Sequence, residues 1–139
     1  MITVSESLGI RATADKVWAI VRDFEHVNRW VIDLASSVPE GEGVGMLRHL
    51  IQRDGARVLE RLDLLDESTK TIEYHIVQSD LAFTTYRSSI KVRSTGPDSC
   101  EVLWTSAFEP KGIDIDQILK TVKTNYLRYL ESLRKLTLA

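Results

Sequence analysis

Residues 56–65 read ARVLERLDLL, and this stretch decides the fold because its side chains alternate between two faces. In a β-strand, residues two apart share a face, so Glu60 lies in a row with Val58, Leu62 and Leu64. The opposite row is mostly charged and predicts the solvent side. A carboxylate in an apolar row needs a partner or water, because an unpaired buried charge is costly. Glu60 therefore belongs either to a structural ion pair or to a cavity that admits polar groups.

A hairpin precedes this strand. Residues 53–55 read Arg-Asp-Gly, and Asp-Gly between two alternating segments is a strong hairpin signal. With the partner strand at residues 45–52, a two-residue loop would put His49 opposite Glu60. One extra loop residue, or a bulge, would put Arg48 there. Arg48 is well suited to bidentate hydrogen bonding with a carboxylate, which also fits a purely structural ion pair.

The rest of the chain continues the same pattern and ends in an amphipathic helix. In order, we expect a strand at 2–10, a helix at 14–23 capped by Thr13, a short helix at 24–30, strands at 34–39, 71–78, 83–94 and 100–108, and a helix from Asp114 to about Leu136. An antiparallel meander must cover its inner face, and only the last helix is large enough. The sequence thus predicts an α+β fold, seven antiparallel strands around one long helix, with a cavity between them.

Length and composition narrow the class of protein. We expect residues 1–139 to form a single domain with a substantial core. A net charge of −2 with scattered Lys and Arg argues against nucleic-acid binding or an anionic membrane. No signal peptide and no apolar run of about 20 residues is present, so no integral membrane association is expected. One cysteine, Cys100, excludes an intramolecular disulfide and fits a reducing compartment. The cytoplasm is the simplest location.

Candidate site residues share the face of Glu60 or the apolar stripe of the last helix. On strand 83–94, the residues expected on the inner face are Thr84, Tyr86, Ser88, Ile90 and Val92. We expect a ligand site built from Arg48, Glu60, Tyr74, Tyr86, Ser88, Trp104, Ile118, Val122 and Asn125. Such a mostly apolar pocket with a few polar groups is typical of small-molecule sites. In the alternative reading the aromatic residues only fill the core, and Asn125 faces solvent.

Metal and cofactor motifs are missing from the sequence. The histidines, at positions 26, 49 and 75, share no ligand spacing with acids or Cys100, so we expect no metal. No phosphate loop, dinucleotide fingerprint or serine-nucleophile motif occurs, and we expect no cofactor.

The succession of segments resembles the START-like helix-grip superfamily (SRPBCC), in the polyketide cyclase/dehydrase and lipid-transport branch. The segments are ATADKVWAIVRDFEHVNRW, VGMLRHL, ARVLERLDLLDE, IEYHI, TYRSSIKV and VLWTSAFEPKG, in order over nearly the whole chain. The resemblance implies a seven-stranded sheet that grips the C-terminal helix around an internal ligand cavity. That family includes both carriers and enzymes.

Plant abscisic acid receptors share this scaffold, and their ERLDILDD stretch is similar to ERLDLLDE here. The similarity carries their pocket residues onto Glu60, Arg48, Tyr86, Ser88 and Asn125. This chain differs from the receptors in three features. Val31 stands at about the position of their hormone-binding lysine, their gate is reduced to residues 53–55, and their latch is reduced to residues 79–81. A gated hormone receptor is therefore not expected.

Three functions remain open from the sequence. The first is binding or transport of a small, largely hydrophobic molecule by a monomer or homodimer. The second is a polyketide cyclase or dehydratase, with Glu60 or Tyr86 moving protons and Arg48 stabilising negative charge. The third is a scaffold that fills its own cavity and acts through protein contacts.

Overall fold

One antiparallel sheet of seven strands dominates the computed structural model of the chain, which describes residues 1–138. The strands lie in the spatial order β1-β7-β6-β5-β4-β3-β2, so β2 to β7 follow one another as hairpins and β1 pairs with β7. This confirms the predicted sheet. The strands are β1 (Ile2–Ile10), β2 (Leu34–Glu40), β3 (Leu47–Gln52), β4 (Arg57–Asp66), β5 (Thr71–Ser79), β6 (Phe83–Gly96) and β7 (Ser99–Pro110).

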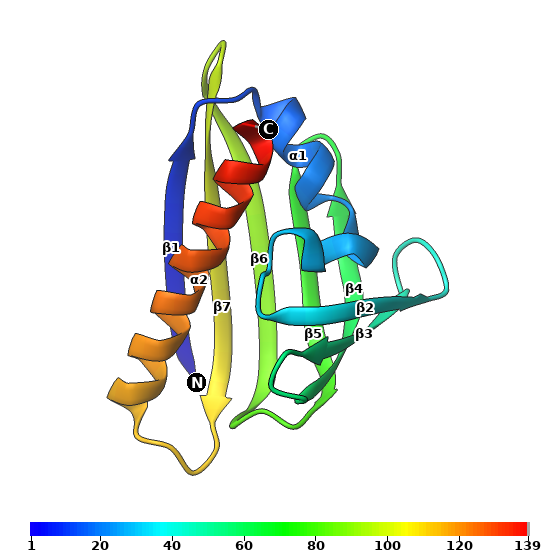
Figure 1. Cartoon of the computed structure of the whole chain (residues 1–139), viewed down its shortest axis with the longest axis vertical. Coiled ribbons are helices and arrows are strands. Elements are labelled where there is room, and N and C mark those ends of the chain that lie inside the picture. The colour runs from blue at the N-terminus through cyan, green and yellow to red at the C-terminus, as the bar shows by residue number, and fades with distance from the viewer. Residues whose placement is uncertain (139) are drawn as a thin grey trace.

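The sheet bends around the C-terminal helix α2 (Ile115–Leu138), and β2 and β3 run across the direction of β5 to β7 (Figure 1). The face of α2 that packs on the sheet is the predicted apolar stripe. Its buried residues are Ile118, Val122, Tyr126, Tyr129, Leu130, Leu133 and Thr137. The helix-grip arrangement is therefore confirmed.

Two short helices lie between β1 and β2, as expected. The first, α1 (Ala14–Val21), is capped by Thr13, whose hydroxyl accepts a hydrogen bond from the backbone N–H of Lys16 at 3.2 Å. The second, η1 (Phe24–Arg29), is a 3₁₀ helix. In Figure 1, α1 is seen beside the C-terminal end of α2, and η1 contacts β2. No helix within residues 1–138 is both long and apolar enough to cross a membrane.

Bulges change which residues face the core at two places. In β4 the register with β5 shifts between Leu62 and Leu64, so Leu64 is 37% exposed and Leu65 packs against the core. The expected row of Glu60 and Leu64 on one face is wrong at Leu64, because an extra residue reverses the alternation.

The second bulge lies in β6, where the register with β7 shifts between Thr84 and Arg87. Thr85 takes a positive φ of 55°, which belongs to the left-handed region. Thr84 is consequently exposed, and the expectation that it shares the inner face with Tyr86 is wrong. Phe83 packs there instead, with its ring centroid 5.2 Å from that of Tyr86 and 4.9 Å from that of Phe108.

Candidate functional site

The hairpin register places Arg48 directly opposite Glu60. Residues 53–56 connect β3 to β4, and a hydrogen bond from the N–H of Gln52 to the carbonyl of Ala56 at 2.8 Å closes a three-residue turn at 53–55. Gly55 has a φ of 93°, which the loop requires and which glycine adopts without strain. The three-residue loop thus decides between the two pairings that the sequence left open. His49 points outward and lies 3.1 Å from Glu40.

Arg48 and Glu60 form a buried ion pair, with exposures of only 4% and 6%. Nε of Arg48 donates to Oε1 of Glu60 at 2.8 Å, and Nη2 lies 2.7 Å from the same oxygen in the ion pair. Nη1 donates to the backbone carbonyl of Phe24 at 2.8 Å. The guanidinium carbon lies 3.8 Å from the ring centroid of Phe24 and 4.7 Å from that of Tyr74. Arg48 is therefore held in place by β4, β5 and η1 at once.

The second carboxylate oxygen of Glu60 has different surroundings. Within residues 1–138, no donor makes a hydrogen bond to Oε2. A charged oxygen needs a donor, since leaving it without one costs more than a neutral group would. Glu60 also lines an internal cavity, so a bound molecule could supply that donor.

The cavity lies between the sheet and α2 and has a volume of about 340 Å³. This volume is at the small end of the range for small-molecule sites. Of the nine predicted ligand residues, eight line it: Arg48, Glu60, Tyr74, Tyr86, Trp104, Ile118, Val122 and Asn125. Ser88 is not among the lining residues. Val31, where the resemblance places the receptors' lysine, lines the cavity with an apolar side chain, as does Leu81.

Ser88 belongs instead to a buried hydroxyl network beneath the cavity wall. Its Oγ accepts a hydrogen bond from Nε1 of Trp104 at 2.6 Å and lies 2.9 Å from Oγ of Ser106. Ser106 also bonds to the hydroxyls of Tyr86 at 3.0 Å and Tyr126 at 2.6 Å, and these two tyrosines bond to each other. The network joins β6, β7 and α2.

Burial disfavours the ionised form of the three tyrosines Tyr74, Tyr86 and Tyr126. It raises the pKa of Tyr86 and raises those of Tyr74 and Tyr126 well above the usual value, because a phenolate would be poorly solvated there. Helical spacing from Val122 puts Tyr126 on the apolar stripe of α2, and alternation with Trp104 puts Ser106 on the inner face of β7, but neither is among the predicted site residues. Alternation predicts that these residues face inward; only the structure shows that their hydroxyls meet.

A second polar cluster lies at the edge of the cavity around Asp33, which the sequence did not single out. Arg128 donates to both oxygens of Asp33, at 3.0 and 3.1 Å, and the hydroxyl of Tyr129 donates to Oδ2 at 2.6 Å. Asn125 accepts a further hydrogen bond from Arg128 at 3.1 Å, so its amide is half-buried and engaged rather than free in solvent. The hydrogen bond from Arg128 lowers the pKa of Asp33. No periodic signal could have linked Asp33 to α2, because the partners are far apart in the sequence.

Replacing Asp33 by Asn tests how much this cluster stabilises the fold. We expect a loss of at most about 1 kcal/mol at pH 7, since the pair is partly exposed to solvent. The folded pKa of Asp33 lies below its ordinary value of 3.8, so its contribution is present above pH 3.8 and is lost as the pH falls through the folded pKa. Urea unfolding of both proteins should therefore differ at pH 7 and converge in acid. An equal difference at both pH values would contradict this role.

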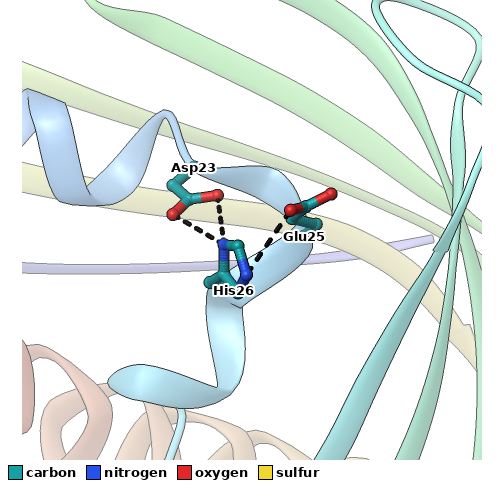
Figure 2. A group of neighbouring side chains, drawn as sticks. All are labelled: Asp23, Glu25 and His26. Atoms are coloured by element: carbon teal, nitrogen blue, oxygen red, sulfur yellow. Dashed lines mark hydrogen bonds and ion pairs between the residues drawn. The ribbon is translucent and has the colours of Figure 1, made fainter.

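Asp23, Glu25 and His26 form a small cluster at the start of η1 (Figure 2). Nδ1 of His26 lies 2.9 Å from both oxygens of Asp23, whereas Nε2 lies 3.4 Å from Glu25. The two carboxylates thus flank opposite nitrogens of the ring. The sequence interpretation did not foresee this grouping, and the exposed ring gives it no link to the cavity.

Comparison with known proteins now identifies the family. Residues 1–137 match the family described as polyketide cyclase / dehydrase and lipid transport. The chain belongs to this family. The match agrees with the sheet, the gripping helix and the internal cavity described above.

The proteins that this chain is similar to include a receptor and an aromatase/cyclase. The chain is 27% identical to the abscisic acid receptor PYL6 of Arabidopsis thaliana, covering 91% of this chain and 65% of that receptor, so it spans about two thirds of the receptor's length. A START superfamily protein from Mycobacterium smegmatis has a TM-score of 0.86 at 18% identity, over 97% of this chain and 96% of that one. The Zhui aromatase/cyclase from Streptomyces sp. R1128 has a TM-score of 0.85 at 16% identity, over 98% and 93%. At these identities the two structures share the fold with this chain.

Proposed function

We propose that the protein binds or carries one small, largely apolar molecule in the cavity beneath α2. The observation that supports this most strongly is the cavity itself: about 340 Å³, with mostly apolar walls and the buried Arg48–Glu60 pair in its lining. Burying apolar ligand surface contributes about 25 cal/mol per Å², which supplies affinity. The few polar groups supply orientation.

The polar groups divide into two kinds. The tyrosine and serine hydroxyls bond to one another, and the Asp33 cluster bonds to α2, so both hold the walls in position. One oxygen of Glu60 receives no hydrogen bond from residues 1–138, so Glu60 is the group best suited to fix the ligand's polar end.

An acid–base enzyme of the cyclase or dehydratase type is the second candidate. The free oxygen of Glu60 favours it, because a carboxylate beside a bound carbonyl compound can take up a proton. Loss of turnover in Glu60→Gln with binding retained would replace the carrier proposal by this one.

The wider setting is part of the same proposal. We take residues 1–139 to act as one helix-grip domain, of which Ala139 lies outside the described residues, and as a monomer or homodimer. A cytoplasmic location is supported by the sequence, with Cys100 as the single cysteine, buried in the core.

The direct test is to locate a neutral apolar probe by NMR. We expect N-phenyl-1-naphthylamine to bind in a one-to-one complex and to give intermolecular NOEs to methyl groups of Val58, Ile118 and Val122, which line the cavity or its floor. Absence of binding, or NOEs confined to exposed methyl groups such as those of Val77 and Leu103, would refute the proposal.

A further inference from the structure

The side chains that line the cavity carry more negative than positive charges, and the positive charge is already paired. Among the lining residues, Asp33 and Glu60 carry carboxylates and Arg48 alone carries a cation. Arg48 is already paired with Glu60, and Asp33 is paired with Arg128 at the cavity edge. No lining residue within the described part of the chain therefore offers a positive charge to a ligand.

The charged hydrogen-bonding group left over in the lining is an acceptor. Oε2 of Glu60 lacks a donor from residues 1–138, while Oε1 accepts a hydrogen bond from Nε of Arg48 and lies in ion-pair contact with Nη2. The hydroxyls of Tyr86 and Tyr126 are engaged with each other and with Ser106. The other lining side chains with polar groups are neutral, and they are Gln52, Tyr74, Trp104, Gln117, Thr121, Asn125 and Tyr129.

We propose that the ligand is a neutral or cationic hydrogen-bond donor, an alcohol, phenol or amine, whose O–H or N–H donates to Oε2 of Glu60. The same site rejects carboxylic acids in their ionised form. This inference rests on the proposed function, and it names the chemical class that the cavity selects.

The physical reason is the balance between desolvation and pairing. A donor that reaches Oε2 makes a charge-assisted hydrogen bond and completes the coordination of a buried carboxylate. An ionised acid entering the cavity loses its water, finds no free cation and approaches the negative charge of Glu60. Both effects favour a hydrogen-bond donor over an ionised acid, so Glu60 alone accounts for the discrimination between them.

Three probes of nearly equal shape test the inference: 2-naphthol, naphthalene and 2-naphthoate. Their affinities are measured at pH 7.5 by displacement of N-phenyl-1-naphthylamine, which is neutral. We expect naphthol to bind more tightly than naphthalene, and naphthoate to bind roughly tenfold or more weaker than naphthol, about 1.4 kcal/mol. If naphthoate binds as tightly as naphthol, the inference is overturned although the proposed function stands. If none of the probes binds, the proposed function fails as well.

Variants of the Arg48–Glu60 ion pair test whether Glu60 causes the preference for naphthol over naphthoate. Glu60→Gln removes the negative charge and leaves Arg48 with no counter-ion, so the preference should reverse toward naphthoate. The double variant Arg48→Met/Glu60→Leu replaces both charged side chains by apolar ones. It takes the place of Glu60→Gln if that single variant does not fold. In the double variant, naphthol should lose its advantage over naphthalene. Persistence of that advantage would assign it to another group and overturn the inference.

Discussion

Replacing Arg48 by Met is expected to lower the free energy of unfolding by about 3–5 kcal/mol. The substitution leaves the Glu60 carboxylate buried at 6% exposure without its partner. It also leaves the carbonyl of Phe24 without the donor that it receives from Nη1. Because Arg48 connects β3 to β4 and to η1, the loss falls on the whole end of the sheet that surrounds the cavity.

Two matched variants separate this effect from the loss of an arginine in general. The double variant Arg48→Met/Glu60→Leu should recover most of the lost stability, since two apolar side chains can replace a buried pair at little cost. Arg93→Met removes one partner of the cross-strand pair with Glu101, which is exposed, and should cost less than about 1 kcal/mol. Urea unfolding with equal m-values measures all three. An Arg48→Met protein as stable as Arg93→Met would show that the buried pair does not hold this end of the sheet.

The sequence predicted the architecture because alternation and helical spacing record burial directly. The pattern of ARVLERLDLL is enough to orient Glu60 inward, and the same rule orients Tyr74 and Trp104. The apolar stripe of α2 needed no other information, since only one element could cover the sheet. Eight of the nine predicted ligand residues line the cavity for this reason.

The sequence predictions that the structure contradicts fail for a different physical reason. Alternation assumes an unbroken strand, so the bulges in β4 and β6 misplaced Leu64 and Thr84. The loop length, which chose Arg48 over His49, depends on backbone geometry at Gly55 that the residue types left open. Ser88 faces inward as predicted, but its hydroxyl is engaged by Trp104 and Ser106 below the cavity wall. Asp33 meets α2 only through the tertiary fold.

Filling the cavity is expected to abolish most of the ligand affinity while leaving the fold intact. Val122 lies on the buried stripe of α2 and lines the cavity, so a larger ring at this position would enter the empty space. Val122→Phe should therefore weaken binding of N-phenyl-1-naphthylamine by roughly thirtyfold or more, about 2 kcal/mol, because probe and ring compete for one volume. Thr124→Leu enlarges an exposed side chain on the same helix and is the matched control.

The fluorescence titration of this probe against wild type, Val122→Phe and Thr124→Leu tests the central claim most directly. Circular dichroism and urea unfolding first establish that all three are folded. The cavity account predicts that Thr124→Leu binds as wild type does and that Val122→Phe loses the stated affinity. Equal binding by Val122→Phe and wild type would contradict it, because a ligand that tolerates a filled cavity is bound elsewhere.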